Sequence, residues 1–441
     1  MQASRMMPAA IPISSPRLKK TLLALRARIF GLRQHAPHRL AAPLCKCHGV
    51  RCRKQLFAAC MELEGSSQAA GRADTMLKAA GFVATCAAAL LVAFGPVKAQ
   101  ISNNPYHVDY NWDKIQGRKI GVASGFKMDP DGKHLWIIDR CGANGCADSD
   151  LDPIIDVTLD GKMVKSFGKG LIGFPHGLFV DKQGNVWVTD GAPEGDPRAA
   201  ASVRKHIGHT VMKFSSDGKV LLTIGTPGVP GADATHMNGP TGVVVQDDGT
   251  IWVTDGHGTG TFSGPYKDNM YASRGGNNRL VEFSPNGKFI RQWGGGKGSE
   301  GSMPLQFNDP HDIELDPATG NMYIADRGNQ RVQVLDKHGS FITRWTEFGK
   351  PSAIAIDNKG HIYVADGMSN ARWNPGWERG IRVGDIKTGW VKAFIPDEID
   401  TPVGNGVAGT EFLGVDPDGD IYSGGAGIKG MVVHKPFRPL D

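Results

Sequence analysis

Apolar and polar residues alternate in short segments from about residue 105 to the C-terminal end of the sequence. Gly-containing turns, among them Asp-Gly and Asn-Gly, separate these segments. Such turns between alternating apolar residues are strong signals of β-hairpins. No helical period of any length interrupts the pattern. The sequence therefore predicts an all-β domain that is built from consecutive antiparallel hairpins.

One sequence unit occurs six times in this region. Each copy has an apolar run, then Asp-x-x-Gly or a close variant, and then a strand centred on an aromatic residue. A second hairpin follows most copies, so each unit supplies four short antiparallel strands. Six such units predict a six-bladed β-propeller, because a β-sandwich would not repeat its turn chemistry six times. The copies span residues 125–140, 177–191, 242–256, 312–327, 353–367 and 412–425.

The last copy is shorter than the others. After residues 412–425 only "GMVVHKPF" can form a further strand, so the sixth blade lacks its outer strand. The segment "YHVDYNWDKI" at residues 106–115 precedes the first blade and can supply it. Pairing the first and last segments would close the ring and cover two sheet edges. We therefore expect an N-terminal strand to complete the sixth blade.

The first 99 residues differ in composition from the repeats. They carry a net charge of +12 against +6 for the whole chain, which leaves −6 for residues 100–441. An acidic remainder gives no reason to expect a nucleic-acid partner. From Met76 a short basic start, an apolar stretch and a small-x-small site ending at Ala99 form the arrangement of a secretory signal peptide. An uncleaved anchor is the alternative, although the apolar run is short for a membrane span.

We therefore expect residues 76–99 to be a signal peptide, with cleavage after Ala99, and residues 100–441 to be periplasmic or secreted. Residues 1–75 are rich in Arg, Ala and Pro and make little sense in front of an export signal. We interpret them as an unstructured or over-extended reading frame, with Met76 as the true start. An organelle transit peptide is the alternative for such an Arg-rich, acid-poor stretch.

Two of the seven cysteines remain in the region of the repeats. They are Cys141 and Cys146, in the Gly- and Asn-containing segment "DRCGANGCADSD". Two cysteines five residues apart in an exported chain predict a local disulfide. A metal site is the weaker alternative, because residues 100–441 contain no second pair of cysteines.

A Pro-His pair begins two of the six copies. Reading the same place in every copy gives Ser124, His176, Thr241, His311, Ser352 and Glu411. The metal-ligating residue types fall in alternate blades, about 120° apart on a six-fold ring. If each starts an innermost strand, His176, His311 and Glu411 converge on the channel and leave an open coordination position. This set suits zinc, and it also suits non-haem iron(II). A hydrogen-bonding or surface role for each His is the alternative.

The six copies resemble NHL repeats, most clearly in residues 308–345. Taken in order, residues 105–437 resemble the lyase domain of peptidylglycine α-amidating enzymes, peptidyl-α-hydroxyglycine α-amidating lyase. The best local matches are "FPHGLFVDKQGNVWVTD", "RLVEFSPNGKFIRQWG" and "DPHDIELDPATGNMYIADR". The resemblance implies the NHL type of six-bladed propeller.

The resemblance also implies a zinc ion that is held by three His from alternate blades. His176 and His311 match two of these, and Glu411 stands where the third His is expected. A carboxylate ligand would make a metal-bound water less acidic and would weaken Lewis-acid catalysis. The family further binds a structural calcium partly through an Asp beside its third His. Phe412 occupies that place, so calcium is not expected.

Active-site side chains follow from the same resemblance. Arg140 and Arg327, which end the aromatic strands of copies one and four, match the family's active-site arginines; an ion pair with a neighbouring Asp is the alternative. The family's proposed base is a Tyr directly after Asp-Gly in blade three, where this chain has His257. A Gly- and Asn-rich insertion with Tyr266 and Tyr271 follows and could cover the channel as a lid. We predict that His257 or one of these tyrosines acts as the base.

Together these features favour an exported, metal-dependent carbon–nitrogen lyase, with zinc or alternatively iron. Its substrate would be an α-hydroxyglycine-type or related hydroxylated small molecule or peptide. Two alternatives remain. A non-catalytic NHL binding propeller fits the missing His, Tyr and Asp of the family, and a metal-dependent hydrolase such as a lactonase fits metal-bound water. We expect a monomer with no nucleic-acid partner and no membrane span in the mature chain.

Overall fold

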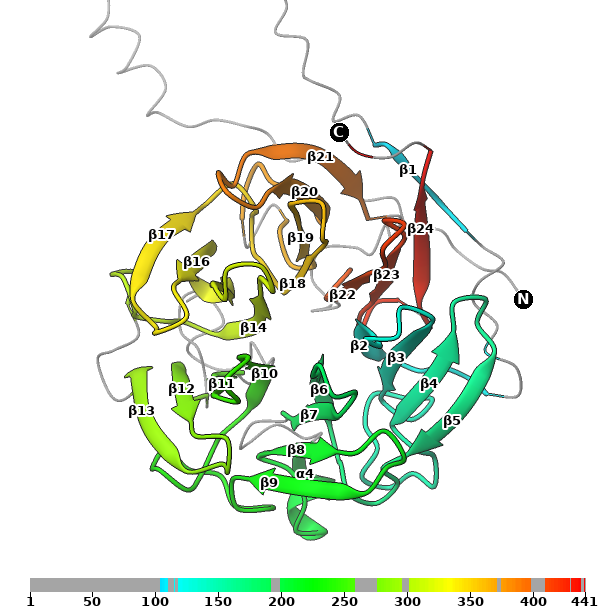
Figure 1. Cartoon of the computed structure of the whole chain (residues 1–441), viewed down its shortest axis with the longest axis vertical. Coiled ribbons are helices and arrows are strands. Elements are labelled where there is room, and N and C mark those ends of the chain that lie inside the picture. The colour runs from blue at the N-terminus through cyan, green and yellow to red at the C-terminus, as the bar shows by residue number, and fades with distance from the viewer. Residues whose placement is uncertain are drawn as a thin grey trace, which may run out of the picture. The chain divides into compact units, whose positions relative to one another are not determined.

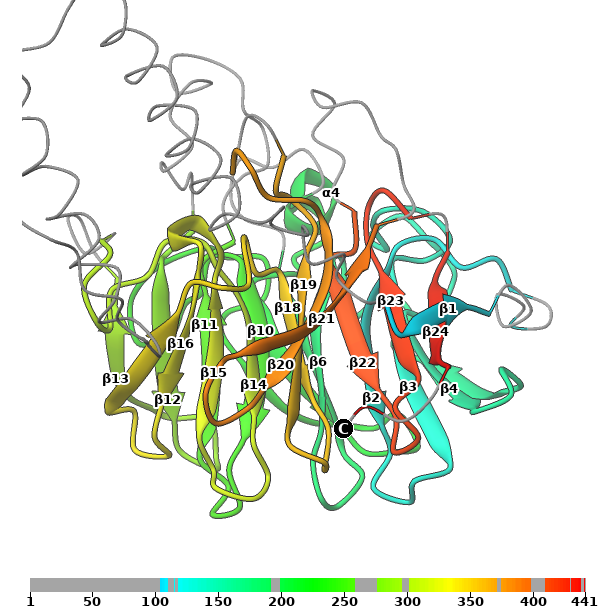
Figure 2. The same cartoon turned by 90° about the horizontal axis from the view of Figure 1, so that it is seen from above.

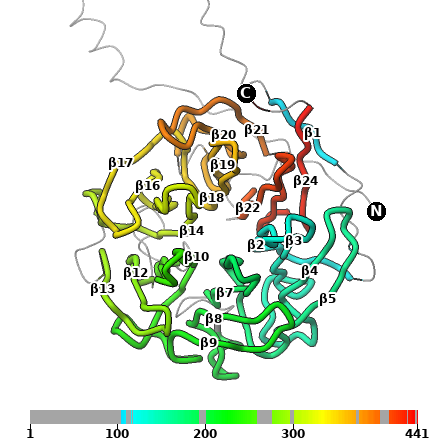
Figure 3. The backbone as a smooth tube through the Cα atoms, viewed as in Figure 1, coloured from blue at the N-terminus to red at the C-terminus, as the bar shows by residue number. Residues whose placement is uncertain are grey.

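The structure is a computed structural model. It describes residues 104–109, 115, 118–191, 199–257, 276–295, 301–370, 374–397, 409–428, 430–437 and 440. Six four-stranded antiparallel sheets surround a central axis in these residues (Figure 1, Figure 3). The six-bladed β-propeller that the repeats predict is therefore confirmed. The predicted extension at 1–75, the predicted signal peptide at 76–99, Tyr266 and Tyr271 lie outside the described residues.

All six blades run from an innermost strand at the axis to an outermost strand at the rim. Blade one holds β2 (Ala123–Met128), β3 (His134–Asp139), β4 (Ile154–Thr158) and β5 (Met163–Phe167). Blade two holds β6 (Pro175–Val180), β7 (Val186–Asp190), β8 (Thr210–Phe214) and β9 (Val220–Ile224). Blade three holds β10 (Pro240–Val245), β11 (Ile251–Asp255), β12 (Arg279–Phe283) and β13 (Phe289–Gly294).

The remaining blades follow the same order. Blade four holds β14 (Pro310–Leu315), β15 (Met322–Asp326), β16 (Arg331–Leu335) and β17 (Phe341–Trp345), with the short 3-10 helix η1 (Arg327–Asn329) after β15. Blade five holds β18 (Ala353–Ile356), β19 (His361–Asp366), β20 (Gly380–Asp385) and β21 (Val391–Pro396). Blade six holds β22 (Phe412–Val415), β23 (Ile421–Gly424), β24 (Val432–Pro436) and β1 (Tyr106–Val108).

Blade six is completed by the N-terminal strand, as the sequence predicts. Strand β1 pairs antiparallel with β24, and Tyr106 lies opposite Pro436. Two further backbone bonds, from Asp109 N to the Val433 carbonyl and from Phe437 N to the Pro105 carbonyl, extend this pairing at 2.8 Å each. The two ends of the repeat region are thereby joined within one sheet, in which β1 covers the edge of β24 and forms the outermost strand.

Apolar side chains fill the interfaces between neighbouring blades. The described residues form six hydrophobic clusters, one at each of the six interfaces. Three Trp on the second strands of blades one to three are almost fully buried there: Trp136, Trp187 and Trp252. Their counterparts in blades four to six are Tyr323, Tyr363 and Tyr422. The aromatic-centred strand of each repeat is therefore the part of the blade that packs against its neighbours.

The turn between the first two strands of a blade explains the Asp-x-x-Gly motif. In blade two, Asp181 Oδ1 accepts bonds from the backbone N–H groups of Gln183 and Asn185, at 3.0 and 2.9 Å. Gly184 has a φ of +78°, which glycine adopts without strain. Asp181 Oδ2 also accepts the indole N–H of Trp187 at 3.1 Å. One carboxylate thus fixes both the turn and the aromatic strand that follows it.

The end of the ring at which the innermost strands begin carries the loops of interest. Helix α4 (Ala199–Arg204) follows β7 and lies at this end (Figure 2). In the loop after β3, Cys141 and Cys146 are joined by a disulfide, with their Cα atoms 5.1 Å apart. In the described part of the chain, no helix combines the length and the apolar character that a membrane span requires.

Candidate metal centre at the channel mouth

The six equivalent positions of the repeats lie at the starts of the innermost strands and are all buried: Ser124, His176, Thr241, His311, Ser352 and Glu411. In blade two the register of β6 against β7 shifts between Pro175 and Leu178, so the strand is irregular at His176. Such a bulge re-aims a side chain. Blades one, three and four have a register shift at the corresponding place.

Hydrogen bonds between blades hold these side chains in place. Ser124 Oγ donates to the carbonyl of Pro175 in blade two, and Thr241 Oγ1 donates to the carbonyl of Pro310 in blade four, each at 2.8 Å. The two imidazoles do the same through Nδ1. His176 Nδ1 bonds the carbonyl of Thr241 at 3.0 Å, and His311 Nδ1 bonds the carbonyl of Ser352 at 2.7 Å.

These contacts determine the tautomer of both imidazoles. A carbonyl oxygen only accepts, so Nδ1 carries the hydrogen and Nε2 keeps its lone pair. The buried Nε2 atoms of His176 and His311 take part in no hydrogen bond. A histidine that donates through one ring nitrogen to a backbone carbonyl and presents the other is arranged as a metal ligand.

A third imidazole, from His257, joins this pair. His257 follows β11, is buried, and donates its backbone N–H to the carbonyl of Gly239 at 2.9 Å. Its ring centre lies 4.8 Å from that of His176 and 5.2 Å from that of His311. Ligand nitrogens of the three residues lie within 4.8 Å of one another, so the described residues contain a three-histidine group that could hold a metal ion.

The surroundings favour the neutral form of the His176 and His311 imidazoles. Burial lowers the pKa of His176 well below its usual value, and His257 and Arg140 act in the same direction. Burial also lowers the pKa of His311 well below its usual value, with Arg327 as the next cause. Both lone pairs are therefore available at neutral pH, as a metal ligand requires.

Glu411, the predicted third ligand, lies between this group and an arginine. Its Oε1 is 3.5 Å from His311 Nε2 and 3.3 Å from Arg327 Nη1. Arg327 Nε in turn donates to Asp309 Oδ2 at 2.8 Å. The buried ammonium group of Lys350 donates to the Arg327 carbonyl at 3.3 Å, and burial lowers the pKa of Lys350 to about 8. Arg327 thus sits between two carboxylates.

Arg140, the other predicted arginine, has different surroundings. Its Nε donates to the carbonyl of Pro175 at 3.2 Å, and its Nη1 donates to Asn144 Oδ1 at 2.8 Å. Its guanidinium carbon lies 3.8 Å from the ring centre of Phe174 and 5.4 Å from that of Phe412. Arg140 is therefore held by a carbonyl and an amide oxygen, and it lies against aromatic faces from blades two and six.

An ion pair crosses the channel further along the axis. Lys127 of β2 and Glu314 of β14 come from opposite blades and pair with each other. Beyond them, the other mouth of the channel opens into a cavity of about 360 Å³, to which the innermost strands of all six blades contribute. The ion pair lies between this cavity and the histidine group and separates them.

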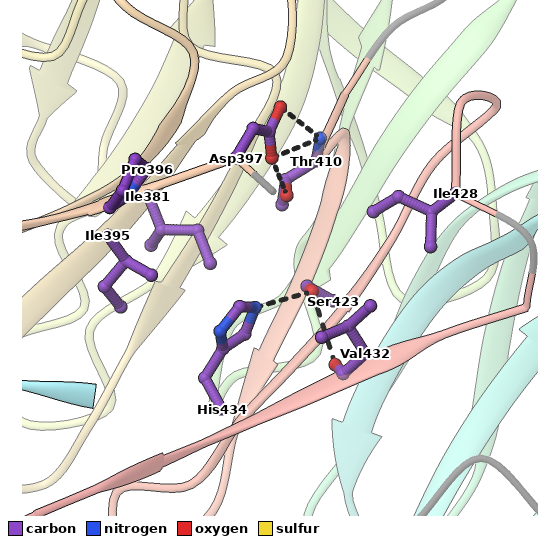
Figure 4. Close-up of a pocket in the computed structure, with 9 residues that line it drawn as sticks. All are labelled: Ile381, Ile395, Pro396, Asp397, Thr410, Ser423, Ile428, Val432 and His434. Carbon is purple, nitrogen blue, oxygen red and sulfur yellow. Dashed lines mark hydrogen bonds between the residues drawn. The ribbon is translucent and has the colours of Figure 1, made fainter. Parts of the chain in front are cut away.

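A smaller pocket, lined mostly by apolar residues, lies between blades five and six (Figure 4). Figure 4 shows Ser423 beside His434, with 3.3 Å between Oγ and Nε2, and Asp397 bonded to Thr410. The pocket has a volume of about 30 Å³, which is room for a few water molecules at most. A substrate does not fit there, so this Ser-His pair is not a candidate catalytic site.

The sequence predicts that four residues lie together at one channel mouth, and the structure places them there: His176, His311, Glu411 and Arg327. From the sequence, His257 was expected only as a base, because it does not stand at one of the six equivalent strand positions. The second strand of blade three carries it to the mouth, directly after Asp-Gly. Its place directly after an aromatic strand could have indicated that His257 is near the metal ligands, since all six such strands end near the same mouth.

Comparisons with known proteins agree with this architecture. Residues 307–335 match the sequence profile of the NHL repeat. The chain is 29% identical over 354 residues to peptidyl-glycine alpha-amidating monooxygenase A of Xenopus laevis, an alignment that covers 75% of this chain and 33% of that protein. It spans about a third of the length of that relative.

Two shorter relatives are covered more fully. A probable peptidyl-alpha-hydroxyglycine alpha-amidating lyase of Caenorhabditis elegans is 28% identical over 254 residues, which cover 54% of this chain and 63% of that protein. Human NHL repeat-containing protein 3 is 30% identical over 277 residues, which cover 60% of this chain and 68% of that protein. Because this last match reaches 30% identity and covers 68% of the relative, and because the chain has six blades, the chain belongs to the family of NHL repeat-containing propeller proteins.

Proposed function

We propose that this chain is a metal-dependent lyase that acts on a hydroxylated carbon bearing a nitrogen substituent. The single observation that carries the proposal is the buried His176–His257–His311 group, in which two Nε2 atoms lack a hydrogen-bond partner. Leaving buried polar atoms unpartnered costs free energy, and a bound metal ion would remove that cost. Relatives that carry the name of an amidating lyase support the choice of reaction.

The three imidazoles fit zinc better than they fit a larger, harder cation, with iron(II) as the alternative. Two nitrogens at 2.0–2.1 Å from one zinc ion are at most about 4.2 Å apart. In tetrahedral coordination they are about 3.4 Å apart, so the ligand atoms, which lie within 4.8 Å of one another, would move closer together by side-chain rotation when the ion binds. Glu411 is the alternative third ligand, and in that case His257 would be left as a base.

In the proposed reaction, the carbinol O–H gives up its proton, and the carbon–nitrogen bond breaks with its electron pair going to nitrogen. Nitrogen takes up a proton, so the products are an amide and an aldehyde, and no co-reactant is needed. A bound zinc ion would supply Lewis-acid polarisation of the substrate hydroxyl. Arg140 and Arg327 would stabilise developing negative charge. With His257 among the ligands, the base is expected to be Tyr266 or Tyr271.

Export forms a second part of the proposal. Residues 76–99 have the arrangement of a signal peptide, and the Cys141–Cys146 disulfide is typical of an oxidising compartment. The mature protein would be periplasmic or secreted and would act as a monomer on a small-molecule or peptide substrate. N-terminal sequencing of the native protein is expected to give Gln100, whereas a start well upstream would contradict export from Met76.

Metal analysis tests the proposed site. Purified protein is expected to retain about one equivalent of zinc or iron, and His176→Ala or His311→Ala is expected to lose most of it. Loss of one imidazole removes a ligand and leaves a buried carbonyl without its Nδ1 donor, so unfolding should be monitored in parallel. Turnover of α-hydroxyhippurate to benzamide and glyoxylate would be reduced at least about a hundredfold in either variant.

His434→Gln, on β24 and away from the histidine group, is the matched control and should keep the metal. A wild-type protein without stoichiometric metal, together with unchanged ligand binding in His176→Ala, would favour a non-catalytic binding propeller. Hydrolysis of a lactone without release of an aldehyde would instead favour a metal-dependent hydrolase.

A further inference from the structure

Glu411 differs from its neighbours in the ring of equivalent positions. Ser124, His176, Thr241 and His311 direct their side chains to the carbonyls of the next blade. Glu411 instead places Oε1 3.3 Å from Arg327 Nη1, across 84 residues of sequence. Its carboxylate therefore contacts Arg327, which is one of the two predicted catalytic arginines near the histidine group.

Two carboxylates already form ion pairs with Arg327. Its Nε pairs with Asp309 at 2.8 Å, and its Nη1 pairs with Glu411. Arg327 is buried, and so are both Glu411 and the ammonium group of Lys350 behind it. In such a water-poor environment an ion pair is screened little, so each carboxylate reduces the attraction of this guanidinium for another anion.

The carboxylate of Glu411 also lies where an anionic ligand group would have to go. It is within 3.5 Å of His311 Nε2 and within 3.3 Å of Arg327, so it occupies the space between the histidine group and the guanidinium. A substrate carboxylate that bound both the metal and Arg327 would have to displace Glu411. It would also meet a like charge there, which is a strong basis for discrimination between ligands.

We infer that Glu411 is a specificity-determining residue that replaces the carboxylate of a substrate at Arg327. The site then selects uncharged carbinolamides, R–CO–NH–CH(OH)–R′ without a carboxylate on the hydroxylated carbon, over α-hydroxyglycines. Cleavage of such a molecule gives an amide and a neutral aldehyde, with the proton and electron balance described above. This inference rests on the proposed lyase function and narrows its substrate class.

Two pairs of compounds that differ in one carboxylate test the inference. N-(hydroxymethyl)benzamide and α-hydroxyhippurate both release benzamide when they are cleaved, with formaldehyde and glyoxylate as the second products. N-methylbenzamide and hippurate are their unreactive analogues, so they report binding without turnover. In the wild-type holoenzyme, kcat/KM relative to the uncatalysed rate is expected to be higher for the uncharged substrate.

Glu411→Gln keeps the shape of the side chain but removes its charge, which releases Arg327 for a ligand. The ratio of kcat/KM for α-hydroxyhippurate to that for N-(hydroxymethyl)benzamide is expected to rise about tenfold, as for one charge-assisted hydrogen bond. The affinity for hippurate, measured by calorimetry, should rise by a similar factor, and the affinity for N-methylbenzamide should stay unchanged.

Glu282→Gln is the matched control. Glu282 is as buried as Glu411, at 8% exposed, and it pairs with Arg291 at 2.6 Å on β12 and β13, away from the channel mouth. Its substitution also removes one ion pair, but it should leave both ligand ratios unchanged. A shift of equal size in Glu282→Gln would mean that the effect comes from stability or global charge, and the inference would be wrong.

The remaining outcomes separate this inference from the proposed function. If both substrates are turned over and the ratio of their kcat/KM values is the same in wild type and Glu411→Gln, the inference is overturned and the lyase function stands. The substrate carboxylate would then bind elsewhere, for example at Arg140. Absence of turnover with stronger hippurate binding in Glu411→Gln retains the specificity role and removes the lyase. Equal hippurate affinity in the two proteins overturns the inference whether or not turnover occurs.

Discussion

At the scale of single residues, the carboxylate that follows the innermost strand in four of the blades shows how the repeat is stabilised. Asp129, Asp181, Asp357 and Asp416 accept a hydrogen bond from the aromatic residue of their own blade, at 2.8–3.1 Å. Blade four departs from this rule, because Tyr323 donates its hydroxyl to the carbonyl of Ile386 at 3.2 Å. Blade three departs further. Gln246 stands at the equivalent place and donates to the carbonyl of Gly320, and the buried indole N–H of Trp252 has no hydrogen-bond partner.

This exception gives a prediction about stability. Trp187→Phe removes an indole N–H that is bonded to Asp181, whereas Trp252→Phe removes one that is buried and unpartnered. Both lose a similar volume, so the packing costs are comparable. Trp252→Phe is expected to lower the free energy of unfolding by about 1–2 kcal/mol less than Trp187→Phe does. Urea unfolding of the two variants measures the difference, and equal losses would contradict the explanation.

At the scale of elements, strand β24 joins the two ends of the repeat region, because it pairs with β23 of its own repeat on one side and with the N-terminal strand β1 on the other. It carries His434, which lies beside Ser423 of β23 (Figure 4). Burial lowers the pKa of His434 to about 4. The folded protein therefore keeps this imidazole neutral at a pH at which the unfolded chain is protonated.

A pH dependence of stability follows from that pKa. Above pH 6.5 the imidazole is neutral in both states and contributes nothing to the dependence. Below pH 6.5 the unfolded chain binds a proton that the folded protein excludes until about pH 4, so the free energy of unfolding falls over this window. At pH 5 the loss from His434 is about 2 kcal/mol.

His434→Gln is expected to remove this part of the acid sensitivity. Chemical unfolding of both proteins at pH 8 gives the packing cost of the substitution alone. At pH 5 the difference between the two proteins should shift by about 2 kcal/mol in favour of the variant. A difference that is the same at both pH values would show that His434 does not contribute to acid destabilisation.

At the scale of the whole molecule, the propeller depends on a closed ring. The innermost strands β22 and β2 contact each other, so blade six packs against blade one as the other neighbours do. The sheet that completes this closure needs β1, which comes from the other end of the repeats. Tyr106 of β1 is 3% exposed and packs in the cluster between blades five and six.

Tyr106→Ala should therefore weaken the closure. A buried aromatic side chain that is cut back to Ala costs about 3–5 kcal/mol of unfolding free energy. Backbone amides of β24 are expected to exchange hydrogen faster in this variant than those of β16, which lies in blade four. His107→Ala, at the exposed neighbouring position, is the control and should leave exchange unchanged. Uniform loss of protection across all blades would instead show that the ring opens as one unit.

Several features could be predicted from sequence because they depend on nearby residues. The Asp-x-x-Gly turns, the alternation of the strands and the number of repeats together predict six blades. The phase of the repeats predicts that His176 and His311 begin innermost strands. Turn geometry and strand alternation act over a few residues, so they are visible in the chain itself.

Only the tertiary structure decided how the side chains at the channel mouth are paired. His257 joins His176 and His311 because β11, the second strand of blade three, ends at the same mouth. Glu411 meets Arg327 across 84 residues of sequence. The order of blades around the ring predicts that such residues come near one another, but ångström-scale distances depend on how the blades pack together. The sequence by itself thus determined the propeller and its two channel imidazoles, and the packing of distant segments decided the third imidazole and the partner of the carboxylate.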